Sequence, residues 1–108
     1  MSALDDQYNK TVSDQRDYLM QLQQAFNQHC DGITAEAQKK LAATPETNLE
    51  ERKRIFDDQK KQLDDALAQL KKEIDTSHTK VRNKLEEIHR KREEERITQL
   101  EQIMDKLK

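Results

Sequence analysis

The sequence of 108 residues is short of several residue types that most folds need. It has one glycine, one proline, one cysteine and no tryptophan, and aromatic residues make up only 4 % of the chain. A thick globular core cannot be filled with so few large side chains. A single cysteine excludes an internal disulfide and fits a reducing compartment. A single glycine excludes glycine-rich phosphate-binding loops and the G-x-S-x-G turn of hydrolases.

The sequence also lacks a long apolar run and an excess of either charge. No apolar stretch approaches the ~20 residues of a membrane helix, and the first residues have no signal-peptide pattern. Twenty basic and 22 acidic residues are interspersed, with a formal net charge of −2. This balance argues against general attraction to nucleic acid or to anionic membranes. We therefore expect a soluble cytoplasmic protein that does not bind membranes.

What the chain does contain is a regular apolar pattern on a highly charged background. Charged residues reach 39 % and hydrophobic residues 32 %. From Leu49 to Ile88 the apolar residues recur at intervals of three, four and seven, and a diluted pattern of the same kind runs from Tyr8 to Ile33. Such spacing is typical of a narrow stripe on a coiled-coil helix. It predicts an all-α fold, with residues 1–108 forming a single helical domain.

Local signals predict where the helices begin and end. Ser2 can cap a first helix over residues 3–43, which we expect to continue through Gly32. Thr44 and Pro45 predict a turn, because a capping hydroxyl stands before a proline suited to the first helical position. A second helix is expected over residues 46–107, where neither glycine nor proline occurs.

The two stripes match each other as an antiparallel hairpin. In such a hairpin the numbers of facing residues add to a constant, and a constant of 89 places the centre between positions 44 and 45. Phe26 then faces Leu63, and Leu22 faces Leu67. The predicted hairpin seam consists of Tyr8, Leu19, Leu22, Phe26, Ile33, Phe56, Leu63, Leu67, Leu70, Ile74 and Val81.

The second helix is longer than its partner, so residues 87–107 are expected to project as a tail. A charged block at residues 90–96 is followed by an apolar stripe. The predicted partner-binding residues are Ile97, Leu100, Met104 and Leu107. An alternative fold is a three-helix bundle with a break at residues 75–79, where five weak helix formers include Thr76 and Ser77 as candidate caps.

The remaining polar clusters do not resemble catalytic or metal sites. His29, Cys30 and Asp31 are consecutive, and neighbours on a helix point about 100° apart, so they cannot easily converge on one ion. We expect His29 at a polar core position. Paired carboxylates such as Glu86-Glu87 meet Lys or Arg three or four residues away, which indicates a solvated helix surface. We therefore predict no enzyme activity, no cofactor, no metal and no small-molecule substrate.

The prediction for function follows from the projecting stripe. The first expectation is a non-enzymatic coiled-coil interaction or scaffold protein that binds protein and self-associates as a homodimer. An alternative is a small accessory or chaperone-like protein whose C-terminal helix binds a client or an assembly ATPase. Nucleic-acid binding is a distant third, because acidic residues interrupt the basic surface around Lys80, Arg82 and Lys84.

Overall fold

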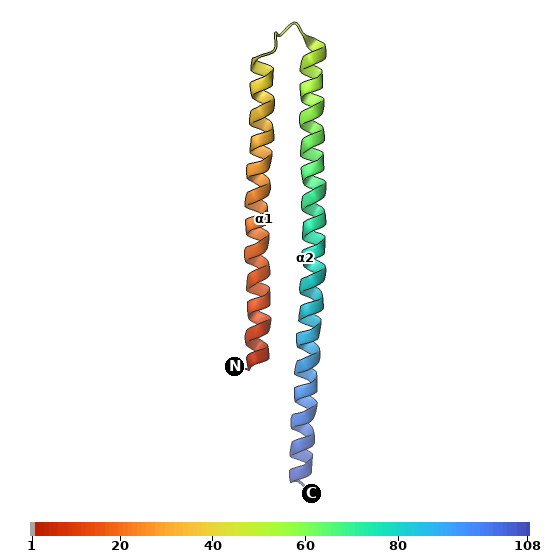
Figure 1. Cartoon of the computed structure of the whole chain (residues 1–108). Coiled ribbons are helices and arrows are strands. Elements are labelled where there is room, and N and C mark those ends of the chain that lie inside the picture. The colour runs from red at the N-terminus through yellow and green to blue at the C-terminus, as the bar shows by residue number, and fades with distance from the viewer. Residues whose placement is uncertain (1) are drawn as a thin grey trace. The chain divides into compact units, whose positions relative to one another are not determined.

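The computed structural model describes residues 2–108 and confirms the predicted all-α helical hairpin (Figure 1). Helix α1 spans Ala3–Ala42 and helix α2 spans Leu49–Lys106, and residues 2–108 contain no strand. The fold divides into two compact units, and each helix contributes to both. Unit 2 is the turn end of the hairpin, Leu19–Asp75, and unit 1 joins the residues up to Tyr18 with Thr76–Lys108.

The connection between the helices is longer than predicted. Helix α2 begins at Leu49 rather than at position 46, and Asn48 caps it by accepting a hydrogen bond from the Glu51 amide at 3.3 Å. Pro45 instead belongs to the turn, where its carbonyl accepts from the Asn48 amide at 3.0 Å. Asparagine is a strong N-cap, so the capping site lies after the proline rather than before it. The expectation that Pro45 opens the helix is therefore wrong.

Arg52 closes the turn from the side of α2. Its Nη1 donates to the carbonyl of Leu41 at 3.2 Å and to that of Thr44 at 3.4 Å. The last carbonyls of a helix have no intrahelical partner, and a charged donor satisfies them well. The turn is thus fixed by a side chain of the opposite helix.

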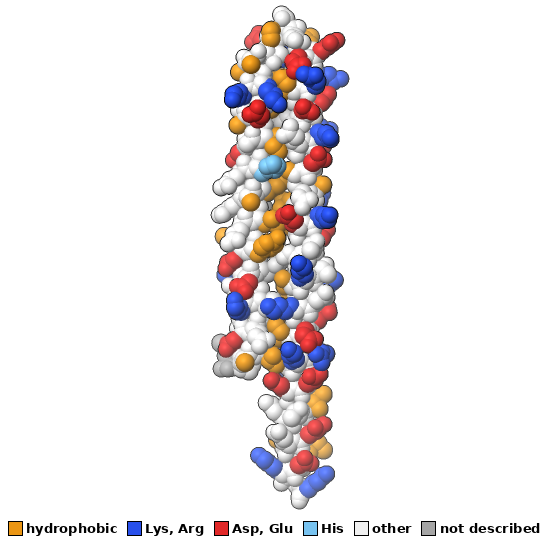
Figure 2. All heavy atoms as spheres, viewed as in Figure 1, with side chains coloured by type: hydrophobic (Ala, Val, Ile, Leu, Met, Phe, Trp, Pro, Cys, Tyr) orange, Lys and Arg blue, Asp and Glu red, His pale blue; other side chains and the backbone are white. Residues whose placement is uncertain are grey.

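The core of unit 2 is a thin seam between the helices (Figure 2). Ile33, Ala37 and Ile55 are buried. The half-buried seam residues of this unit are Leu19, Leu22, Phe26, Leu63, Leu70 and Ile74. Phe56 and Leu67 differ from the prediction, because they remain 52 % and 42 % exposed.

The inward positions repeat every eleven residues instead of every seven. In α2 they run through positions 55, 59, 63, 66, 70 and 74, and in α1 through 19, 22, 26, 30, 33, 37 and 41. Eleven residues in three turns correspond to ~3.67 residues per turn, close to the ~3.6 of a straight helix, whereas a heptad stripe drifts by ~20° per repeat. Because the packing follows the eleven-residue repeat, the Ile55 side chain points toward the other helix and the Phe56 side chain lies at the flank of the seam.

The pairing of the helices is also offset from the predicted one. One groove of unit 2 is lined by Leu22 and Phe26 from α1 together with Ala66 and Leu70 from α2. Phe26 shares this groove with Ala66, which lies three positions beyond the predicted partner Leu63. The hydrogen bond between Gln15 and Ser77 shows the same offset, because their numbers add to 92 instead of 89. This offset equals the delay in the start of α2, so the longer turn accounts for it.

In unit 1 the seam contains polar as well as apolar residues. Leu4 and Ile88 are buried, and Val81 is half-buried. Thr11 is 5 % exposed, and its hydroxyl is satisfied by donating to the Gln7 carbonyl at 2.7 Å. Tyr8, a predicted seam residue, is 37 % exposed.

Helix α2 continues without a break through residues 75–79, so the predicted alternative of a three-helix bundle is wrong. Ser77 does not cap a helix. Its hydroxyl donates across the seam to Oε1 of Gln15 at 2.7 Å. The weak helix formers in this segment are tolerated because Ser77 occupies an inward position that makes a hydrogen bond to the other helix.

Candidate interaction surface

The end of α2 carries the largest cluster of exposed aliphatic side chains in unit 1. All four predicted partner-binding residues are exposed, and a fifth, which the sequence analysis missed, lies among them. The exposed fractions are 54 % for Ile97, 54 % for Leu100, 55 % for Ile103, 63 % for Met104 and 81 % for Leu107. These five residues are called the tail surface below, and Figure 2 shows hydrophobic side chains along one edge of this part of α2. Ile103 fits the three-four spacing between Leu100 and Leu107 as well as Met104 does, and the prediction placed only Met104 there.

Three residues of the tail surface, Ile97, Leu100 and Met104, lie away from the face of α2 that packs on α1. Ile88, the most buried residue at 3 % exposure, marks that face. At about 100° per residue, Leu100 lies roughly 120° and Ile97 roughly 180° around the helix from Ile88. A longer α1 following the same seam would therefore leave Ile97, Leu100 and Met104 exposed, whereas Ile103 and Leu107 fall at positions that the eleven-residue repeat turns inward. Every residue from Glu94 to Lys108 is exposed.

A polar cluster closes the seam just before the tail. Arg92 Nη2 donates to Asp5 Oδ1 at 2.5 Å, and its guanidinium carbon lies 4.9 Å from the centre of the Tyr8 ring. The Ser2 hydroxyl, which caps α1 by accepting from the Asp5 amide at 3.1 Å, lowers the pKa of Asp5, and Arg92 lowers it further. Tyr8 thus contacts the charged block through a cation–π interaction. This cluster ties the first turns of α1 to α2.

The charged block is largely neutralised within α2. Arg90 pairs with Glu87 and, at 2.5 Å, with Glu94, while Arg96 lies 3.4 Å from Glu93. Hydrogen bonding to Arg90 lowers the pKa of Glu87, and the same contact raises the pKa of Arg90. Basic groups already paired with carboxylates are poorly suited to neutralising phosphates, which argues against nucleic-acid binding here.

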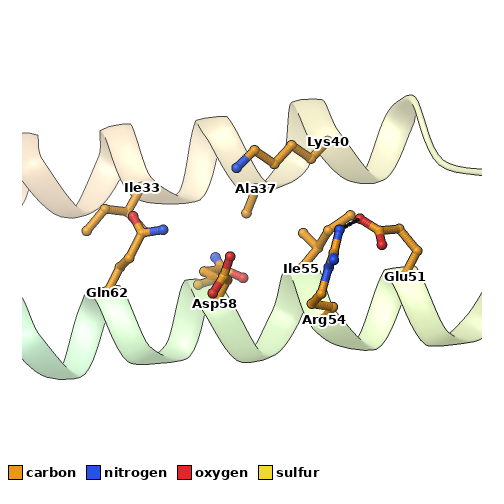
Figure 3. Close-up of a pocket in the computed structure, with 9 residues that line it drawn as sticks. Ile33, Ala37, Lys40, Glu51, Arg54, Ile55, Asp58 and Gln62 are labelled. Atoms are coloured by element: carbon orange, nitrogen blue, oxygen red, sulfur yellow. Dashed lines mark hydrogen bonds and ion pairs between the residues drawn. The ribbon is translucent and has the colours of Figure 1, made fainter.

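Unit 2 contains a cavity of about 290 Å³ near the turn (Figure 3). Figure 3 shows Ile33 and Ala37 reaching from α1, with Ile55 opposite on α2. The polar lining residues are Lys40, Glu51, Arg54, Asp58, Gln59 and Gln62. The Glu51 carboxylate accepts from Arg54 at 2.8 Å, so it does not face the cavity as a free acid. The apolar part consists of seam residues, and the cavity is best described as a gap in the packing of the hairpin.

His29 and Cys30 do not form a ligand cluster. His29 is exposed, contrary to the expected core position, and lies at the rim of the groove beside Phe26, while Cys30 is half-buried. Within residues 2–108, no group of three or more histidine, cysteine, aspartate or glutamate side chains is arranged to hold a metal ion. Neither described helix is long and apolar enough to span a membrane.

Comparison of the chain with protein-family models, with curated proteins and with solved structures gives no significant match. The residues of the chain itself are therefore the basis for any function, and the tail surface is the feature whose exposed aliphatic side chains are best suited to binding a partner.

Proposed function

We propose that the chain is a non-enzymatic coiled-coil interaction or scaffold protein, located in the cytosol, that forms a homodimer through the tail surface. The single observation that carries the proposal is the cluster of five aliphatic side chains, each more than half exposed, at the end of α2. Monomeric proteins expose few large contiguous apolar patches, and those they do expose are often binding sites.

The size of the tail surface suits a second copy. Five half-exposed aliphatic side chains present on the order of 500 Å² of apolar area, the upper range for the largest patch of a monomer. Two such surfaces in contact would remove about 1,000 Å² from water, the lower limit for a specific interface. A small dimer interface of moderate affinity is therefore expected.

The test is to place two carboxylates in the tail surface. Leu100→Asp combined with Met104→Asp should weaken self-association about 100-fold or more, because four charges would be buried without partners. Light scattering over a range of concentrations measures the mass, and circular dichroism checks that the helices remain. Met20→Asp is the matched control, since Met20 is 58 % exposed on α1 and lies outside the tail surface.

Three outcomes are distinguished. A wild-type dimer that the double variant abolishes and the control preserves supports the proposal. A dimer that survives the double variant places the interface elsewhere. A wild-type protein that stays monomeric contradicts self-association and favours the accessory function, in which the same surface binds a client or an assembly ATPase.

A further inference from the structure

We propose that two copies pair their tails in antiparallel orientation, about a twofold axis that passes beside Gln102. This inference rests on the proposed homodimer and adds its orientation, its register and the charges that select it. The residues involved lie in the last turns of α2 and in the two residues that follow it, Leu107 and Lys108, and all of their side chains are exposed.

The tail surface is symmetric about Gln102. Leu100 and Met104 each lie two residues from it, and Ile97 and Leu107 each lie five residues from it. Facing positions of antiparallel helices add to a constant, so one register pairs all four residues. Leu100 then packs on Met104 of the second copy, and Ile97 packs on Leu107 of the second copy. A twofold interface of this kind is self-complementary.

Ile103 distinguishes antiparallel from parallel pairing. It flanks the stripe and is 55 % exposed. In antiparallel pairs the flank that carries Ile103 faces the same flank of the other helix, so Ile103 meets its own copy next to the axis. In a parallel pair Ile103 would instead face the charged Lys108 of the second copy and would have no apolar contact there.

The charges on the other flank favour the same arrangement. This flank carries Glu94, Glu101 and Lys108 at intervals of seven residues. Antiparallel pairing places Glu94 of each copy opposite Lys108 of the other, which gives two attractive contacts. The two copies of Glu101 face each other, which gives one repulsive contact. The Glu94 and Lys108 side chains are 61 % and 82 % exposed, and Glu94 Oε1 already accepts from Arg90 at 2.5 Å.

Parallel pairing would bring like charges together. Extending the stripe backwards by seven residues from Ile97 and Leu100 reaches Arg90 and Glu93. In a parallel pair each of these would face its own copy next to the apolar contact, and charges of the same sign facing each other repel. In the antiparallel register both lie outside the overlap of the two apolar stripes.

The experiment exchanges the two flanking charges. Glu94→Lys and Lys108→Glu should each weaken the dimer about tenfold in low salt, and the variant carrying both should recover the wild-type dissociation constant. Dissociation constants are measured by sedimentation equilibrium, with circular dichroism as the control for helicity. In a parallel dimer positions 94 and 108 are not opposed, so the combined variant would not recover.

A second readout reports orientation directly. On a Cys30→Ala background, chains with Leu100→Cys are mixed with chains with Met104→Cys and oxidised. Disulfides between the two different chains support the antiparallel pair. Disulfides within each kind of chain, or a dimer without recovery in the charge exchange, overturn the antiparallel pair and leave the proposed homodimer intact. A monomer at all concentrations overturns the homodimer itself, and with it this inference.

Discussion

Residue scale: Gly32 stands in the interior of α1, ten residues before its end, and nothing in the fold requires a glycine there. It has no positive φ, and a Cβ built on it meets no atom within 4 Å. Glycine destabilises a helix interior because it loses more backbone entropy on folding than other residues do. The helix passes through this position because seam residues on both sides, such as Phe26 and Ile33, hold it in place.

Gly32→Ala should therefore raise the free energy of unfolding by about 1 kcal/mol. Urea unfolding followed by circular dichroism measures the change. Ala35→Gly, at an exposed position one turn away, is the reverse control and should lower stability by a similar amount. If Gly32→Ala destabilised the protein, the surface at Gly32 would have to be in contact with a second molecule, because nothing within the hairpin approaches it.

Asp5 links the start of α1 to the charged block, and its titration reports this contact. The Ser2 hydroxyl and the Arg92 guanidinium lower its pKa below the ordinary 3.8. A carboxyl with a lowered pKa in the folded state adds stability above its unfolded pKa, and this stability is lost as the pH falls through the folded value. The first turn of α1 should therefore loosen in acid, below pH 3.8.

Ser2→Ala and Arg92→Gln should each raise the pKa of Asp5 towards its ordinary value. NMR titration of the Asp5 carboxyl carbon measures the pKa. Arg16→Gln on the same helix should leave it unchanged, because Arg16 lies next to Asp17 instead, at 3.8 Å. A titration of Asp5 unaffected by Arg92→Gln would mean that the ion pair does not persist in solution.

Element scale: the choice between neighbouring residues of α2 shows which repeat governs the packing. Ile55 is 6 % exposed and Phe56 is 52 % exposed. A heptad seam would turn Phe56 inward, whereas the eleven-residue repeat turns Ile55 inward. The two residues are adjacent in the sequence, so substitutions at them compare the two repeats at the same place in the helix.

Ile55→Ala should cost about 2–4 kcal/mol of unfolding free energy, as large-to-small changes in a core do. Phe56→Ala should cost less than about 1 kcal/mol, because half of its side chain stays in water. Urea unfolding gives both values, and Ile55→Val supplies a milder change if the alanine variant does not fold. A larger loss of unfolding free energy for Phe56→Ala than for Ile55→Ala would show that the seam follows the heptad repeat instead.

Whole-molecule scale: the hairpin buries few residues, and the large apolar side chains that it leaves exposed are the basis of the proposed interaction function. Among the described residues, only six are buried, and one of these is Thr11. A narrow seam of this kind gives modest stability, since apolar burial is the main favourable contribution. If two tails pair, unfolding becomes coupled to dissociation, and the protein gains stability with concentration.

The sequence by itself determined the two helices, their order and the apolar tail. Periodic apolar residues in a segment without glycine or proline specify long helices, and one proline near the middle of the chain leaves one place for the turn. These signals are local, so they can be read without the fold. The candidate residues Ile97, Leu100, Met104 and Leu107 were predicted from the same local spacing, which Ile103 also fits between Leu100 and Leu107.

Only the tertiary structure decided which side of each helix faces inward and which residues meet. Spacings of three and four fit a seven-residue and an eleven-residue repeat equally well over a few turns, and the two diverge only gradually along a helix. The length of the turn depends on the Asn48 cap and on Arg52 reaching the end of α1. Those contacts exist only when both helices are in place, so the offset of three positions could not be derived from either helix alone.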